Sequence, residues 1–269
     1  MTRTPSLTDR LLRRAPRVNL VRLHGMIAAG GRGRLSDAAL APMLERAFRQ
    51  GRPRAVALSI NSPGGSPVQS ALIAARIRRL ADEHEVKVHA FVEDVAASGG
   101  YWIAAAADEI VADAVSVLGS IGVIAGGFGA PEAIAKLGVE RRIYTAGRMK
   151  SQLDPFRPED PEEVARLQRL LDQMHAAFIG HVRDRRGEKL DAAADIFTGE
   201  FWLGGESVKL GLADGLGHPV PHLRGIYGDK VRIVPYEMRR PFLSRFGLAL
   251  VEDALMLAEE RALWARYGM

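Results

Sequence analysis

One serine lies in a setting suited to nucleophilic chemistry. Ser98 stands in the stretch Asp-Val-Ala-Ala-Ser-Gly-Gly-Tyr-Trp, after an apolar run at residues 86–92 that predicts a buried strand and before an alanine-rich run that predicts a helix. At a helix N-terminus, backbone N–H groups and the positive end of the helix dipole stabilise an oxyanion that forms nearby. Serine is also a preferred N-cap residue, so this motif alone is compatible with a nucleophile or with a cap.

A pair of glycines follows another predicted strand, at residues 55–60. Gly64 and Gly65 end the loop Asn-Ser-Pro-Gly-Gly. Two glycines let the backbone approach a ligand closely and turn its N–H groups toward it, as an oxyanion hole requires. Residues 66–69, Ser-Pro-Val-Gln, predict a helix start with proline at the first helical position and a capping box. An ordinary strand-to-helix turn would show the same pattern.

A lysine further along the chain could serve as a base. Lys150 lies in Gly-Arg-Met-Lys-Ser-Gln-Leu-Asp-Pro-Phe, residues 147–156, after a predicted short strand at residues 141–144. A lysine accepts a proton only when it is neutral, and burial or a nearby positive charge lowers its pKa toward that state. Most lysines are exposed, so the motif alone is also compatible with a solvated surface residue.

Together, these segments resemble peptidase family S49, the signal peptide peptidase A and SohB-like serine proteases that use a Ser-Lys dyad. The nucleophile motif of the family is similar to residues 94–101, and its lysine motif, which ends in Pro-Phe, is similar to residues 147–156. The resemblance implies that Ser98 is the nucleophile and that Lys150 is the general base. It extends over residues 18–236.

The resemblance also implies supporting roles. A third family element, Gly-Ser-Ile-Gly-Val, is similar to residues 119–123, and by this likeness Ser120 would hydrogen-bond the lysine and orient it. Gly64 and Gly65 would supply part of the oxyanion hole, together with the N–H group of Gly99.

The implied reaction is acyl transfer through a covalent intermediate. Lys150 would take the proton of Ser98 as its oxygen attacks a peptide carbonyl, and water would then release the acyl-enzyme. Such a dyad needs no third acid, so Asp94, at the end of a predicted strand, suits a capping or loop-fixing role. We expect no cofactor and no metal.

Strand and helix patterns alternate along the sequence. Beyond the strands already named, we predict a strand at residues 18–23 and helices at residues 36–50, 67–83 and 161–186. This alternation is typical of an α/β fold with a mainly parallel sheet covered by helices. The resemblance narrows it to the ClpP/crotonase-like superfold of repeated ββα units, as a single domain with a C-terminal helical extension.

Three parts are expected along the chain: a basic N-terminal arm at residues 1–17, the S49-like domain at residues 18–236 and a C-terminal amphipathic helix at residues 237–269. The helix could pack on its own domain, dock on a neighbouring subunit or lie on a membrane with the basic arm. A linker-like stretch at residues 215–221 precedes it.

Composition limits the classes of function. With 269 residues and 47% hydrophobic content, the chain can bury a large core, and the absence of cysteine excludes disulfides and a cysteine nucleophile. The net charge of +5 is compatible with a nucleic-acid partner, but only 6% of the residues are aromatic and no binding motif is present, so we expect none. His175 and His181 are six residues apart, which does not place them on one helical face as a metal pair.

The sequence contains no run of about 18 apolar residues and no signal-peptide core, which predicts a cytoplasmic location. Contact with the inner membrane through the termini is left open. The resemblance implies an ATP-independent serine endopeptidase that acts on unfolded proteins or short peptides, such as signal-peptide remnants, and that forms a homo-oligomer whose neighbouring chains can complete each site.

Two alternatives share the expected fold: a crotonase-like acyl-CoA enzyme, which would use the same oxyanion hole, and a non-catalytic scaffold. The presence of both Ser98 and Lys150 favours the peptidase.

Overall fold

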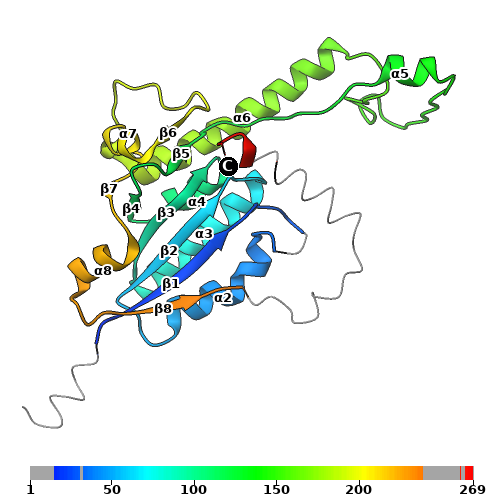
Figure 1. The fold of residues 1–269 in the computed structure, drawn as a ribbon. Helices are drawn as coiled ribbons and strands as arrows, with labels where there is room; N and C mark the ends of the chain where they lie inside the picture. The colour runs from blue at the N-terminus through cyan, green and yellow to red at the C-terminus, as the bar shows by residue number, and fades with distance from the viewer. Residues whose placement is uncertain (1–14, 31–32, 239–260, 262–263, 269) are drawn as a thin grey trace, which may run out of the picture.

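The computed structural model describes residues 15–30, 33–238, 261 and 264–268, so most of the predicted N-terminal arm and C-terminal helix lies outside the described residues. Figure 1 shows a central sheet with helices on both faces and one long helix that extends away from it. The strands are β1 (Arg17–His24), β2 (Ala55–Ser62), β3 (Lys87–Ala97), β4 (Glu109–Ala112), β5 (Val117–Gly119), β6 (Phe201–Leu203), β7 (Gly215–Leu216) and β8 (Arg232–Tyr236). The helices are α2 (Asp37–Arg49), α3 (Pro67–His84), α4 (Gly99–Ala105), α5 (Pro131–Lys136), α6 (Pro161–Arg186), the 3₁₀ turn η1 (Gly187–Lys189), α7 (Gly204–Lys209) and α8 (Pro219–Tyr227).

The sheet is mainly parallel, as predicted. Its main path runs β6-β5-β3-β2-β1-β8, and only the pair β5–β6 is antiparallel. Strand β3 forks the sheet: its first half, from His89, pairs with β4, whereas its last residues, Val95–Ala97, pair with β5. The strand therefore continues past the predicted end at residue 92 and leads directly into Ser98.

Both faces of the sheet are covered, which explains why β2 is buried almost throughout. On one face, α2, α3 and α4 pack side by side over the larger core. On the other face, Leu223 of α8 joins a smaller cluster with Val18, Ala57 and Phe91. Successive side chains along each strand point to opposite faces of the sheet, so alternate residues contribute to the two cores.

Helix α6 has the predicted bounds, but its two halves differ. Phe178 and Val182 are buried, and Trp102 of α4 stacks on Phe178 at 4.7 Å between ring centroids. His181 stacks on the same indole, and its Nε2 donates to the Trp102 carbonyl at 2.9 Å. Burial lowers the pKa of His181, which keeps the ring neutral. The second half of α6 therefore fixes α4, the helix that follows Ser98.

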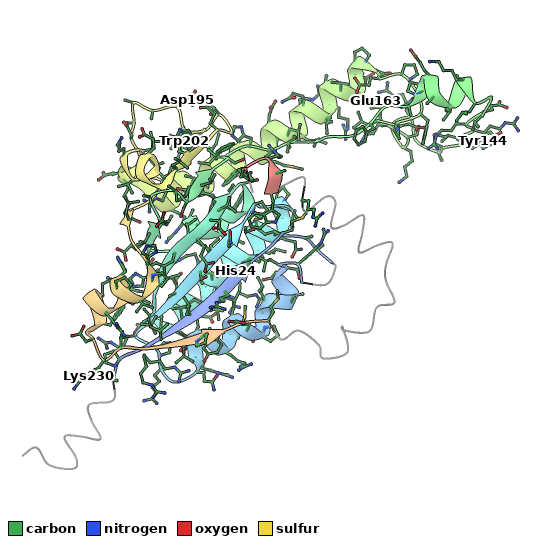
Figure 2. All side chains as sticks on the ribbon, in the orientation of Figure 1. His24, Tyr144, Glu163, Asp195, Trp202 and Lys230 are labelled. Carbon is green, nitrogen blue, oxygen red and sulfur yellow. The ribbon has the colours of Figure 1, made fainter. Side chains whose placement is uncertain are left out.

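The first half of α6 extends away from the sheet together with α5 and residues 122–160, which we call the arm (Figure 1). Tyr144 lies near its far end in Figure 2 and is 91% exposed. The predicted strand at residues 141–144 is wrong, because this segment lies in the arm without strand pairing in the structure. Among the described residues, no helix combines the length and apolarity needed to cross a membrane.

Two smaller predictions also need correction. Ser66 caps α3 by accepting the N–H of Gln69 at 3.4 Å, but Gln69 does not complete a capping box. Its Oε1 accepts the backbone N–H of Asp37 at 2.9 Å, because the N–H of Ser66 already donates to the carbonyl of Ile27. The predicted linker at residues 215–221 instead contains β7, which pairs with β4, and the first turn of α8.

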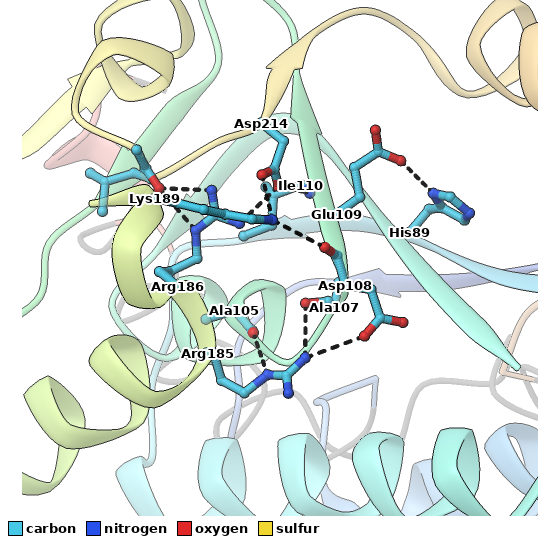
Figure 3. A network of polar contacts seen from close by, with 12 residues as sticks. His89, Ala105, Ala107, Asp108, Glu109, Ile110, Arg185, Arg186, Lys189 and Asp214 are labelled. Carbon is cyan, nitrogen blue, oxygen red and sulfur yellow. Dashed lines mark hydrogen bonds and ion pairs between the residues drawn. The ribbon is translucent and has the colours of Figure 1, made fainter. Parts of the chain in front are cut away.

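A buried arginine joins the end of α6 to the sheet (Figure 3). Arg186 donates to the Gly211 carbonyl through Nε at 2.9 Å and Nη2 at 2.7 Å, and through Nη1 to Asp214 at 2.8 Å. Asp214 also accepts from Lys189 and from the backbone N–H of Ile110. Burial alone would raise the pKa of the Asp214 carboxyl, but these hydrogen bonds hold it below its usual value.

We expect Arg186→Ala to lower the free energy of unfolding by about 3 kcal/mol, because Asp214 and the Gly211 carbonyl lose a buried donor. Urea denaturation would measure the change. Arg166→Ala, an exposed arginine on the same helix, is the matched control and should change stability by less than about 0.5 kcal/mol. Equal effects of the two substitutions would contradict the assigned role.

The cost of Arg186→Ala should also depend on pH. A lowered folded-state pKa stabilises the fold above the ordinary value of 3.8, and this contribution disappears as the pH falls through the lowered value. The difference between wild type and variant should therefore shrink in acid. Urea denaturation at neutral pH and near pH 3 would test this, and a constant difference would contradict it.

Candidate active site

Ser98 occupies a strained turn between β3 and α4. Its φ of 51° and ψ of −121° are unusual for a residue with a side chain, and such a conformation costs about 1–3 kcal/mol. The N–H of Ser98 donates to the Gly119 carbonyl at 2.8 Å, and its own carbonyl accepts from Trp102 at 3.0 Å, so the surrounding structure holds the turn. The side chain makes no N-cap hydrogen bond, which disfavours the simple capping role.

The loop at residues 62–65 lies directly against this turn. A Cβ on Gly64 would meet the Gly99 nitrogen at 2.8 Å and the Cβ of Ser98 at 2.9 Å, and the φ of Gly64 is +100°. A Cβ on Gly99 would lie 2.2 Å from the Oγ of Ser70 on α3. Glycine is therefore required at both positions: a side chain at Gly64 would push the loop away from the turn, and a side chain at Gly99 would push the turn away from α3.

Two backbone N–H groups are suitable for an oxyanion. Gly99 is the first residue of α4, so its N–H has no acceptor within the helix. Gly65 lines a cavity together with Ser98. Hydrogen bonds of Ile27 with Gly64 O (2.9 Å) and Ser66 N (2.8 Å) hold the loop on either side of Gly65. The N–H of Gly64 donates to Ser62 Oγ at 3.3 Å, so this N–H group stabilises the conformation of the loop.

Ser120 lines the same cavity, which has a volume of about 210 Å³. Its φ is 52°, a second positive value for a residue with a side chain, and its N–H donates to the Glu200 carbonyl at 2.6 Å. The Oγ of Ser120 accepts a hydrogen bond from the hydroxyl of Tyr267 at 3.4 Å. The structure thus brings Ser98, Ser120 and Gly65 together around one small cavity.

The described end of the chain contributes to the wall of this cavity. Arg266 and Tyr267 contribute to its lining, and Trp264 and Tyr267 pack on the residues of β3 and β5 beside Ser98. The ring of Tyr267 also makes an edge contact with Phe201, with 5.2 Å between centroids. The predicted C-terminal helix lies mostly outside the described residues, and the part described packs on its own domain.

Lys150 lies outside the cavity beside Ser98. It is exposed, it belongs to the arm segment between α5 and α6, and it is not part of the Ser98 cavity lining. Its backbone N–H donates to the Gly147 carbonyl at 3.1 Å, within a turn. Hydrogen bonds within the arm stabilise its conformation: buried Glu163 accepts the backbone N–H of Leu153 at 2.7 Å and a hydrogen bond from Arg157. One chain therefore does not bring Ser98 and Lys150 together.

Asp94 fixes the ends of two neighbouring strands. Its Oδ2 accepts from the side chain of Asn61 at 2.6 Å, and the other end of Asn61 accepts the backbone N–H of Val95 at 3.2 Å. The carboxylate lines a neighbouring groove of about 550 Å³ and not the Ser98 cavity. This geometry agrees with a loop-fixing role.

Sequence reasoning missed a polar cluster on the sheet face beside these strand ends. His24 Nε2 lies 3.0 Å from the Oγ of Ser59 and 3.3 Å from the carboxylate of Glu93, and Ser59 donates to Glu93. Figure 2 shows His24 on the sheet. The three residues come from β1, β2 and β3, so only the alternation within each strand, which places them on one face, could have suggested the cluster.

The comparisons with known proteins identify the family. The model of peptidase family S49 matches residues 81–219, about half of the chain, including Ser98 and Lys150. The chain therefore belongs to peptidase family S49, a family of serine peptidases. A chloroplastic serine protease SPPA of Arabidopsis thaliana is 32% identical over 61% of this chain and 24% of that protein.

A longer match has a different name. A Na⁺/H⁺ antiporter NhaA of Brucella melitensis is 49% identical over 98% of this chain, but the chain spans only 39% of that protein. That name belongs to the Brucella protein, most of which has no counterpart in this chain.

Solved structures show the fold. A 1510-N membrane-bound stomatin-specific protease, in complex with a substrate peptide, aligns with a TM-score of 0.53 at 13% identity, over 86% of this chain and 95% of that one. With the mixed sheet described above, this likeness defines a single α/β domain of the ClpP/crotonase-like fold.

The strain at Ser98 can be measured independently of any activity. We expect Ser98→Gly to raise the free energy of unfolding by about 1 kcal/mol, because glycine adopts the positive φ without strain. The greater conformational entropy of glycine in the unfolded chain offsets only part of this stabilisation. Ser98→Ala keeps the strain and should change stability by less than about 0.5 kcal/mol. Urea denaturation would compare them, and a glycine variant less stable than the alanine variant would argue against strain at this turn.

Proposed function

We propose that this protein is an ATP-independent serine endopeptidase that uses Ser98 as nucleophile and Lys150 as general base. The observation that carries the proposal is the strained turn at Ser98, which lines a cavity together with Gly65 and leads into Gly99, the first residue of α4. A conformation of this kind presents the hydroxyl to a substrate, and strained residues of this sort cluster at active sites.

The steps follow from these residues. Neutral Lys150 takes the proton of the Ser98 hydroxyl as Oγ bonds to the peptide carbonyl carbon, and the resulting oxyanion accepts from the N–H groups of Gly65 and Gly99. The C–N bond then breaks as the proton passes to the leaving amine, which leaves an ester on Ser98. Water, deprotonated by Lys150, attacks this ester and releases the second product.

The lysine would come from a neighbouring chain, since one chain keeps its Lys150 in the arm. The arm exposes large apolar side chains, among them Phe128 at 94%, Leu137 at 77% and Ile124 at 72%, which is typical of a surface that another protein covers. Docking the arm of one chain beside the cavity of the next is a head-to-tail contact, which closes into a ring when the rotation allows. In such a homo-oligomer, Ser120 would hydrogen-bond the incoming lysine.

The substrates we propose are unfolded proteins or short peptides, such as signal-peptide remnants. A cavity of about 210 Å³ next to Ser98 suits a small or modest apolar side chain. The neighbouring groove, which shares Tyr267 with the cavity, offers space for an extended chain. The solved 1510-N protease was itself found with a substrate peptide. A cytoplasmic location belongs to the same proposal.

The dyad is tested by cleavage of a small-residue fluorogenic peptide and of unfolded casein without ATP. We expect Ser98→Ala and Lys150→Ala each to lower kcat/KM by at least about 10³-fold, since each removes a reacting group. Lys136→Ala, another exposed lysine of the arm, is the matched control and should remain active. Cleavage that survives in either dyad variant would contradict the proposal, and acyl-CoA binding without peptide cleavage by the wild type would favour the crotonase-like alternative.

Mixing the two inactive variants tests the shared site. If each site combines Ser98 of one chain with Lys150 of another, random co-assembly of equal amounts restores about one quarter of the sites. The variants would be unfolded together, refolded and assayed, with each variant refolded alone as the control. Inactive mixed assemblies, where both variants are shown to be incorporated, would place the two residues in the same chain.

A further inference from the structure

We propose that His89, Glu109 and His222 form a Zn²⁺ site that joins α8 to the sheet. The three residues belong to β3, β4 and α8. His89 Nδ1 lies 2.6 Å from Oε2 of Glu109, and His222 Nε2 lies 3.1 Å from the same oxygen. One potential ligand atom from each residue lies within 4.8 Å of the other two.

The donor set and its spacing suit zinc. Two imidazoles and one carboxylate are a common protein ligand set for Zn²⁺, with bonds of about 2.0–2.2 Å and therefore about 3.3 Å between ligand atoms in a tetrahedron. The separation of His222 Nε2 from Glu109 Oε2, 3.1 Å, is close to this value, whereas that of His89 Nδ1 from the same oxygen, 2.6 Å, is a hydrogen-bond length that would have to lengthen.

Neighbouring groups hold the two rings in place. Nε2 of His89 lies 2.8 Å from the hydroxyl of Tyr227, so a hydrogen bond there leaves Nδ1 as the ligand atom. The ring of His222 packs edge-on against Phe91, with 5.5 Å between centroids. His89 is only 4% exposed. Such support of the far nitrogen and of the ring faces is what metal-binding histidines require.

The site remains reachable from solvent. His89, Glu109 and Tyr227 line a groove of about 770 Å³, through which an ion and a fourth, water ligand could enter. Asp108, Asp214 and Lys189 also line this groove, and Lys189 neutralises Asp214 at 2.7 Å. Figure 3 shows Glu109 directed to His89, apart from the Arg186–Asp214 network.

The position argues for a structural ion. His89 precedes Ser98 by nine positions on the same strand and its turn, a span of about 30 Å in extended chain, so the ion would not touch the reacting atoms. Helix α8 has nine residues and buries only Leu223, which leaves it few apolar contacts. A metal that bridges β3, β4 and α8 would add three strong bonds at this point. The sequence predicted no metal; the separation of His89 and His222 in the chain gives no motif that would have indicated this site.

Titration of the chelator-stripped, full-length protein with Zn²⁺ alone tests the site by calorimetry. We expect one saturable site per chain and a higher thermal midpoint with Zn²⁺. His222→Ala and Glu109→Gln should weaken binding by at least about tenfold. The glutamine keeps an acceptor for the histidines but is a poor zinc ligand, which separates metal binding from hydrogen bonding.

His218→Ala is the matched control, since this exposed histidine lies next to the same helix and should leave the affinity unchanged. Circular dichroism would confirm that the variants are folded. The absence of saturable Zn²⁺ binding by the wild type, or equal affinity in all variants, would overturn the proposal and leave a hydrogen-bond network only. Neither readout depends on peptidase activity.

Discussion

The close contact between two backbone segments determines the rest of the site. The loop at residues 62–65 and the turn at Ser98 approach so closely that Gly64 leaves no room for a side chain, and Gly99 is packed as closely against Ser70 of α3. Gly65 and Ser98 line the same cavity, and Gly99 follows Ser98 as the first residue of α4. Because the positive φ of Ser98 is costly by itself, the packing around it must overdetermine the turn, and hydrogen bonds to Gly119 and Trp102 do so.

The parallel sheet makes the contact possible. Strands β2 and β3 are neighbours that run in the same direction, so their carboxyl ends, and the loops that follow, meet at one edge. Helices α3 and α4 begin there, and α6 fixes α4 from outside through Trp102 and His181. The antiparallel pair β5–β6 then brings Ser120 to the same edge. The sheet edge that carries Ser98, Ser120 and Gly65 is thus built from segments that the fold joins, not from neighbours in sequence.

Local patterns predicted what local forces determine. The bounds of α6, the cap at Ser66 and the turn at Ser98 follow from apolar periodicity, capping residues and small residues, and the structure has them. The strand predicted at residues 141–144 was wrong, because β-propensity forms a strand only beside a partner. The polar clusters at His24 and His89 were missed, since each joins residues of separate strands or helices through tertiary packing, and strand alternation alone indicates a shared face but not which residues meet.

The position of Lys150 has a consequence for control of the proposed peptidase. In one chain Lys150 and Ser98 are apart, so under the proposed mechanism an isolated chain would lack the base that activates the serine. Activity would then rise with assembly, in the way that any function built at a subunit interface depends on concentration. The exposed apolar side chains of the arm would supply the driving force for that assembly, and the same arm would carry the proposed base. Association and activation would therefore be one event.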